Sequence, residues 1–114
     1  MEIEVLYFDG CATWRAAVSD VQEVLSELGL KEEVRLVRVE SREEAERLRF
    51  LGSPTVRVNG KDVESGIASE GFGVECRLYW VDGDPTGLPP KRWIKDAVGA
   101  AHAPPDGERR RSPA

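Results

Sequence analysis

The sequence is poor in the residues that most often build catalytic centres: its 114 residues include one histidine and two cysteines. The histidine, His102, lies where the last predicted helix frays, so we expect neither a Ser-His-Asp triad nor a metal site. Met1 leads directly into a short apolar run, without a basic segment, a long hydrophobic stretch or a small-residue cleavage site. We therefore expect a cytoplasmic protein with no membrane contact and with Cys11 and Cys76 both reduced.

Basic residues are in the minority, with 16 Lys and Arg against 21 Asp and Glu and a formal net charge of -5. No basic face with interleaved aromatic residues is visible, so we do not expect nucleic acid as a partner. The only basic run, at 109–111, lies in a segment rich in proline, glycine and charge, which predicts a disordered tail over 102–114. The length of the remainder suits one domain, residues 1–101.

The first half of the chain predicts two strands joined by a helix. Residues 2–8 are apolar and rich in strand formers, and they stop at Asp9-Gly10. Apolar residues then follow one helical stripe over 12–28 until Gly29, which is a natural helix end. Apolar and charged residues alternate over part of 34–39, as in an outer strand of a sheet. Strands connected in this way are parallel.

The second half predicts a short helix, two more strands and a last helix. Ser41 to Glu44 fit a capping box, and we expect the helix that follows to end at Gly52. A strand over 53–58 leads into Asn59-Gly60, which is typical of a tight turn. The returning strand is either 61–64 or, after a long connection, 75–81; we favour 75–81 because it is longer and richer in strand formers. Apolar spacing after Pro89-Pro90 predicts the last helix.

The expected fold is therefore α/β, with the order β-α-β-α-β-β-α and a mixed four-stranded sheet flanked by three helices. This order, the cysteine of "FDGCATW" at the first strand-to-helix corner and "SPTV" at the third strand resemble the thioredoxin-like fold superfamily over residues 1–101. The stretch "SPTVRVNGKDV" is most similar to glutaredoxin-type members. "FDGCATW" and the later "ECRLYW" also resemble small bacterial thioredoxin-family proteins of unknown function, some labelled alkylmercury lyases.

Cys11 is the main candidate for a reactive group. The start of a helix offers unpaired amides and a partial positive charge, which lower a thiol pKa from about 8.5 into a range of roughly 3.5 to 7.5. Arg15, one helical turn along, adds to this effect, whereas Asp9 opposes it. The alternative is an inert cysteine packed as a small apolar side chain.

The second cysteine of a Cys-x-x-Cys motif is absent, because Trp14 stands in its place. A thiol at Cys11 would then depend on an outside thiol such as glutathione, as a co-substrate, or on Cys76. If residues 75–81 form the returning strand, Cys76 lies well over 10 Å from Cys11, at about 3.4 Å per residue, and serves only in packing. If residues 61–64 return instead, this argument lapses and Cys76 is free to act as a resolving or ligand thiol.

The resemblance also implies that Pro54 follows a cis peptide bond beside Cys11, with the backbone of Ser53 turned toward an extended substrate. A trans proline at the start of a strand is the alternative. Trp14 either walls an apolar groove for a ligand or packs on the sheet.

The leading hypothesis is a thioredoxin-like protein with a single reactive thiol, acting in thiol–disulfide exchange or a glutathione-linked redox role. As an enzyme it would be a monothiol thiol–disulfide oxidoreductase without a bound cofactor or metal. The nucleophile would be Cys11, and the substrate-binding residues would be Ser53, Pro54, Thr55, Trp14 and Arg15. The partner would be a thiol or disulfide, in a small molecule or a protein, and we expect a monomer or weak dimer.

Two alternatives belong to other functional classes. The missing second cysteine fits a non-catalytic module that binds a peptide or protein partner on the same scaffold. Soft-metal or organomercurial binding through Cys11 and Cys76 is the other alternative, and it requires the two sulfurs to approach within about 5 Å.

Overall fold

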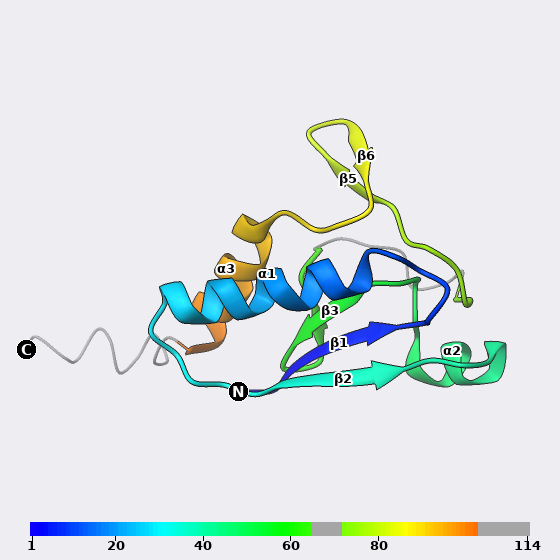
Figure 1. Cartoon of the computed structure of the whole chain (residues 1–114), viewed down its shortest axis with the longest axis horizontal. Coiled ribbons are helices and arrows are strands. Elements are labelled where there is room, and N and C mark those ends of the chain that lie inside the picture. The colour runs from blue at the N-terminus through cyan, green and yellow to red at the C-terminus, as the bar shows by residue number, and fades with distance from the viewer. Residues whose placement is uncertain (65–71, 103–114) are drawn as a thin grey trace, which may run out of the picture.

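The computed structural model describes residues 1–64 and 72–102, so the tail expected after residue 102 lies outside the described residues. Three helices and six strands follow one another along these ranges (Figure 1). In chain order they are β1 (Ile3–Tyr7), α1 (Trp14–Glu27), β2 (Val34–Arg38), α2 (Arg42–Leu48), β3 (Thr55–Val58), β4 (Lys61–Asp62), β5 (Tyr79–Val81), β6 (Asp84–Thr86) and α3 (Lys91–His102).

Four strands form a mixed sheet in the order β2-β1-β3-β4. β1 is parallel to β2, as the βαβ pattern predicts, and antiparallel to β3, which in turn is antiparallel to β4. α1 and α3 cover one face of this sheet, and α2 lies beyond the end of β2 (Figure 1). The α/β class, the three helices and the mixed four-stranded sheet are confirmed.

Two apolar clusters hold these layers together. The larger joins inward residues of α1 and α3 to one face of the sheet and includes Val5, Val21, Val56 and Ile94, each no more than 1 % exposed. The smaller gathers Leu6, Val39, Ala45 and Phe50 around α2. Because adjacent residues of β1 enter different clusters, this strand is buried on both faces, which explains its nearly continuous apolar sequence.

The returning strand is β4, so the preferred assignment of residues 75–81 to this position is wrong. Asn59 and Gly60 have φ values of 52° and 80°, which is the geometry of a two-residue turn that reverses the chain at once. This turn pairs Val58 with Lys61. Residues 79–81 instead pair with 84–86 around a second turn of the same kind, at Asp82 and Gly83. The resulting hairpin projects from the body of the protein (Figure 1).

The predicted serine cap forms at the start of α2, whereas the glutamate reaches one residue further back than in a standard capping box. The Ser41 hydroxyl accepts a hydrogen bond from the amide of Glu44 at 3.1 Å, and the Glu44 carboxylate reaches back to the amide of Glu40 at 3.0 Å. The predicted end of this helix at Gly52 is wrong. α2 ends at Leu48, and Arg49 takes the left-handed conformation that closes it, with φ 57°.

Gly52 has a different role, because another part of the chain passes directly over its backbone. Its φ of +127° is one that residues with a side chain rarely adopt. A Cβ atom added at this position would lie 2.8 Å from the Cβ atom of Arg77. Gly52 therefore allows the segment that contains Cys76 and Arg77 to approach the start of β3.

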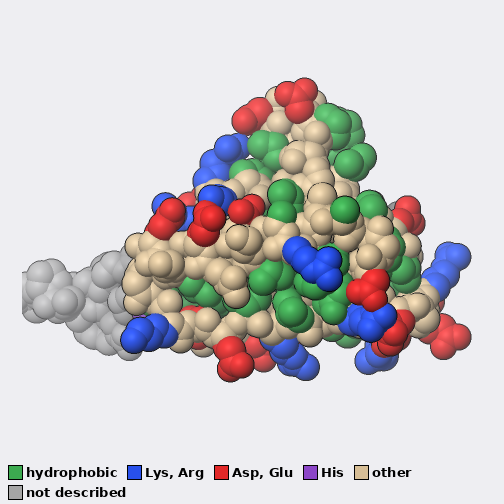
Figure 2. Space-filling model, viewed as in Figure 1, with side chains coloured by type: hydrophobic (Ala, Val, Ile, Leu, Met, Phe, Trp, Pro, Cys, Tyr) green, Lys and Arg blue, Asp and Glu red, His purple; other side chains and the backbone are tan. Residues whose placement is uncertain are grey.

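Charged side chains of both signs are interspersed over the face of the protein shown in Figure 2. This distribution agrees with the moderate net charge of -5. Within the described ranges, none of the helices combines the length and the apolar character that a membrane crossing requires.

Candidate functional site

Cys11 lies in the connection between β1 and α1, two residues before Thr13, the N-cap of the helix. Its backbone amide donates to the carbonyl of Phe8 at 3.2 Å, which closes the turn after the strand. The residue is 2 % exposed. Its sulfur nevertheless has polar neighbours, because it lies 3.2 Å from the Thr13 hydroxyl and donates to the Ser53 carbonyl, also at 3.2 Å. The site therefore differs from a hydrocarbon pocket around an inert cysteine.

Polar neighbours determine the ionisation of Cys11. Burial by itself raises the pKa of this thiol, because an anion loses solvation in the interior. Hydrogen bonding by the hydroxyl and backbone of Thr13 acts in the opposite direction, as do the nearby side chains of Cys76 and Ser53, and together they leave the pKa below its ordinary value. The lowered pKa predicted from the helix start is thus present, with Thr13 as its main source.

Ser53 supplies a hydroxyl that the neutral site leaves without a partner. The side chain is 0 % exposed, and its Oγ atom makes no hydrogen bond within the described structure. Buried polar groups are seldom left unpaired, so this hydroxyl is available to a group that appears only when the site changes state. An ionised Cys11 sulfur fits that requirement, because the Ser53 side chain lowers its pKa.

The backbone around Ser53 is fully used within the chain. The Ser53–Pro54 peptide bond is cis, as the resemblance implies. The Ser53 amide donates to the Glu75 carbonyl at 2.8 Å, and the Ser53 carbonyl accepts from the Arg77 amide at 2.9 Å. Residues 75–77 therefore occupy the edge that the resemblance assigns to an extended substrate.

Cys76 lies beside Cys11, contrary to the separation of well over 10 Å that an outer position in the sheet would require. Ser53 and Cys76 pair as a parallel bridge, and the Cys11 sulfur contacts the carbonyl of the same Ser53. The nearness of the two thiols lowers the pKa of Cys11 and raises that of Cys76. Both cysteines are free, with Cys11 buried and Cys76 exposed.

Trp14 and Arg15 face a different neighbour from the one expected. The Trp14 ring stacks on Tyr7 of β1, with ring centres 4.0 Å apart. The Arg15 guanidinium lies 4.7 Å from the centre of the Trp14 ring. Arg15 is not among the groups that shift the pKa of Cys11, and Asp9 is paired with Arg38. Packing on the sheet, one of the two interpretations of Trp14, is the one that the structure shows.

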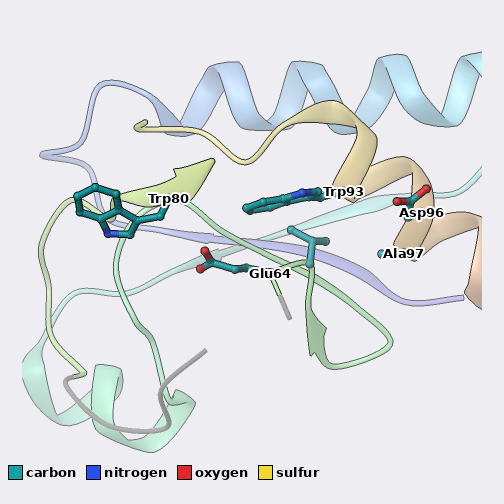
Figure 3. Close-up of a pocket in the computed structure, with 6 residues that line it drawn as sticks. Glu64, Trp80, Trp93, Asp96 and Ala97 are labelled. Carbon is teal, nitrogen blue, oxygen red and sulfur yellow. The ribbon is translucent and has the colours of Figure 1, made fainter. Parts of the chain in front are cut away.

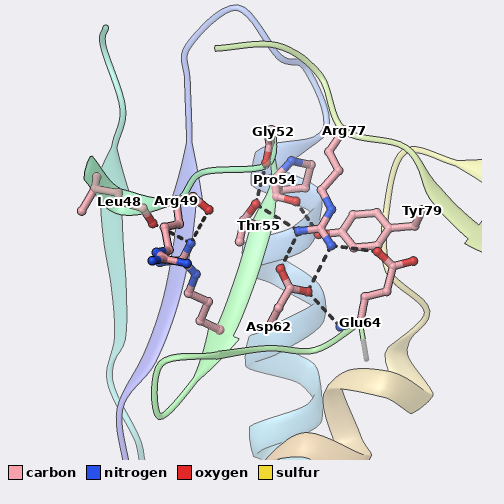
Figure 4. A network of polar contacts seen from close by, with 10 residues as sticks. Leu48, Arg49, Gly52, Pro54, Thr55, Asp62, Glu64, Arg77 and Tyr79 are labelled. Carbon is pink, nitrogen blue, oxygen red and sulfur yellow. Dashed lines mark hydrogen bonds and ion pairs between the residues drawn. The ribbon is translucent and has the colours of Figure 1, made fainter. Parts of the chain in front are cut away.

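A buried ion network holds the Cys76 segment against the start of β3 (Figure 4). The Arg77 guanidinium contacts both oxygens of Asp62, at 2.7 and 3.1 Å, and Glu64 at 2.8 Å. It also donates to the Thr55 hydroxyl at 3.1 Å and lies 4.1 Å from the centre of the Tyr79 ring. The Arg77 side chain is 5 % exposed. A charge removed from water to this degree is stable only with such partners.

Tyr79 completes this network at the proline. Its hydroxyl donates to the Pro54 carbonyl at 2.5 Å, and burial raises its pKa still further above physiological pH. None of Arg77, Asp62, Glu64 and Tyr79 was predicted from the sequence. The available signal was the alternation of two carboxylates, Asp62 and Glu64, immediately after the Asn59-Gly60 turn.

An open cavity of about 550 Å³ lies next to the network and shares Glu64 with it. Figure 3 shows the Glu64 carboxylate between the indole rings of Trp80 and Trp93, with Asp96 further along α3. Neither cysteine lines this cavity, and its lining offers no thiol or hydroxyl group. The thiol pair therefore defines the candidate site. Across residues 1–64 and 72–102, no three His, Cys, Asp or Glu side chains gather as a metal site.

Replacing Thr13 with valine is expected to raise the pKa of Cys11, because valine keeps the branched shape but removes the hydroxyl nearest to the sulfur. The pKa is measured as the midpoint of the pH dependence of Cys11 alkylation, in a chain that also carries Cys76→Ser. Thr13→Ser retains the hydroxyl and is the matched control. An equal midpoint in the valine and serine variants would rule out this role of Thr13.

Fold and site together define a small α/β protein in which two thiols from distant parts of the chain meet beside a cis proline. The sequence profile of the family described as Domain of unknown function (DUF2703) matches residues 9–98. The chain belongs to this family, and the matched region contains both cysteines. No curated protein and no solved structure gives a significant match.

Proposed function

We propose that the protein carries out thiol–disulfide exchange, with the Cys11 thiolate as the reacting group. The observation that carries the proposal is the set of polar contacts around a buried sulfur: the Thr13 hydroxyl and the Ser53 carbonyl, both at 3.2 Å. The thiolate is the reactive form of cysteine, and a lowered pKa increases its share at any given pH. An unpaired buried hydroxyl on Ser53 adds a donor for the same anion.

We also propose that the fold is thioredoxin-like. The strand order β2-β1-β3-β4, a thiol between β1 and α1 and a cis Ser53–Pro54 bond beside it support this assignment. The resemblance then implies a thiol or disulfide as the substrate, glutathione as a co-substrate, and the cytoplasm as the compartment in which reduced cysteines persist.

The proposal predicts that Cys11 ionises below the ordinary thiol pKa of about 8.5. In a Cys76→Ser chain, iodoacetamide can label only Cys11, and mass spectrometry follows the labelling rate against pH. Burial slows this reaction at every pH, whereas the midpoint depends on the ionisation alone. We expect the midpoint to lie below that of the same chain unfolded in guanidinium chloride. A midpoint equal to or above the unfolded value would exclude a stabilised thiolate.

A non-catalytic binding module is distinguished by Cys11→Ser. Exchange with a small disulfide at this position would then be lost, whereas binding of a partner by the scaffold alone would survive. Serine has nearly the shape of cysteine, so the comparison isolates the sulfur.

The close approach of the two thiols also favours soft-metal binding as a second candidate function. Soft ions prefer thiolate ligands, and Cys11 and Cys76 supply two of them at one point. Titration with mercuric ion would detect such a site as one ion bound per chain. This binding should be lost in Cys11→Ser and in Cys76→Ser. Equal binding by the wild-type chain and both variants would exclude it.

A further inference from the structure

We propose that Cys11 and Cys76 form one redox pair, which closes an internal disulfide, so that Cys76 takes the place of the missing second cysteine of a Cys-x-x-Cys motif. The inference rests on the proposed function, because it requires exchange chemistry at Cys11. It makes Cys76 the thiol that first meets the outside disulfide and keeps Cys11 as the thiolate that attacks in the second exchange. A bound outside thiol is then unnecessary for releasing the substrate.

Backbone contacts place the two cysteines within reach of each other. Residues 75–77 are tied to Ser53 by two hydrogen bonds, at 2.8 and 2.9 Å, one on either side of Cys76. Backbones paired in this way lie about 4.8 Å apart. The Cys11 sulfur lies 3.2 Å from the carbonyl of the same Ser53, and the two thiols are near enough to shift each other's pKa. The common contact with Ser53 thus brings both cysteines to the place where a disulfide, which requires Cα atoms within about 7 Å of each other, is proposed to form.

The network around Arg77 keeps this arrangement in place. Arg77 follows Cys76 directly and is bound by Asp62 and Glu64, which belong to the chain just after β3. Tyr79, three residues after Cys76, is bound to the Pro54 carbonyl. Cys76 is thus followed by two anchored residues, and the backbones of Glu75 and Arg77 on either side of it are both bonded to Ser53.

Exposure differs between the two sulfurs in a way that suits a stepwise reaction. Cys76 is exposed, so an outside disulfide reaches it without a change in the fold, whereas Cys11 is 2 % exposed. Cys11 is the thiol that ionises more easily, and it lies beside Cys76. It is therefore placed to attack the Cys76 sulfur once that sulfur is bonded to an outside thiol.

The reaction proceeds in two exchanges. In the first, the Cys76 thiolate attacks a disulfide R–S–S–R, forms a Cys76–S–S–R bond and releases one thiolate, RS⁻. In the second, the Cys11 thiolate attacks the Cys76 sulfur, forms the Cys11–Cys76 disulfide and releases the second RS⁻. The protein loses two electrons and the substrate disulfide gains them. A low-molecular-weight thiol such as glutathione reverses both exchanges and restores the reduced pair.

The test uses the reduced full-length chain and oxidised glutathione as the probe. After reaction at neutral pH and an acid quench, intact mass and peptide mapping without reductant identify the products. The wild-type chain is expected to lose two hydrogens and to link the peptides that contain Cys11 and Cys76. Cys11→Ser is expected to accumulate a glutathione adduct on Cys76, because the attacking thiol is missing. Since the wild-type measurement needs no substitution, a folding defect cannot imitate the result.

A wild-type chain that retains a glutathione adduct as its stable product, without the linked peptides, would overturn the internal disulfide. That result would leave the proposed function intact if the alkylation midpoint of Cys11 in the folded Cys76→Ser chain still lies below that of the unfolded chain. If the alkylation midpoint of Cys11 in Cys76→Ser equals that of the unfolded chain, the result counts against the proposed function itself. Linked peptides from two different chains, seen as a covalent dimer, would also overturn the inference.

Discussion

Replacing Arg77 with methionine is expected to lower the free energy of unfolding by about 3–5 kcal/mol. Methionine fills much of the space of the arginine stem but leaves the carboxylates of Asp62 and Glu64 without their cation. Their side chains are only 11 % and 19 % exposed, so water cannot fully replace the lost contacts. Urea denaturation at neutral pH measures the change, since the midpoint falls while the slope stays constant.

Arg92→Met is the matched control for this prediction. Arg92 pairs with Asp82 at 3.4 Å, but the two side chains are 57 % and 82 % exposed, so its replacement should cost about 0–1 kcal/mol. Adding Asp62→Asn and Glu64→Gln to Arg77→Met removes the unpaired charges and should recover part of the loss. If Arg77→Met destabilises the protein no more than Arg92→Met does, the buried network does not hold the fold together.

Local signals in the sequence predicted most of the fold. The apolar patterns of β1, α1 and α3 and the serine cap of α2 report contacts close in the chain or burial on one face. The incorrect strand assignment has a physical cause of the same local kind. Asn59-Gly60 and Asp82-Gly83 each reverse the chain immediately, and a tight turn has more influence on pairing than the length of a later apolar run.

The candidate site was only half predictable for the opposite reason. The position of Cys11 at a strand-to-helix corner is visible locally, and the resemblance indicates Pro54. The approach of Cys76 depends on an ion network between residues far apart in the chain, and no periodic pattern reports such a contact. Arg77 reads in the sequence as one of 16 basic residues, and only the folded chain distinguishes it by burial.

Gly52→Ala is expected to destabilise the protein and also to prevent efficient closure of the Cys11–Cys76 disulfide. An alanine Cβ would lie 2.8 Å from the Cβ atom and 3.1 Å from the Cα atom of Arg77, and 3.1 Å from the Glu75 carbonyl oxygen. Two of these three atoms belong to the backbone, so rotation of a side chain cannot relieve the overlap. The segment 75–77 must therefore move away from Ser53 and take Cys76 with it. Peptide mapping after treatment with oxidised glutathione measures the loss of closure.

Gly29→Ala separates this steric effect from the conformational cost of a positive φ. Gly29 has φ +70° and no other atom within 4 Å of the added Cβ, so the substitution should cost only about 1–2 kcal/mol and leave disulfide closure at the wild-type rate. Gly52→Ala should lower the free energy of unfolding by more than Gly29→Ala does. It should also slow closure of the Cys11–Cys76 disulfide at a temperature where both variants remain folded. Closure at the wild-type rate in folded Gly52→Ala would mean that Cys76 reaches Cys11 without the backbone contacts to Ser53, and the clamped arrangement would then have no part in the chemistry.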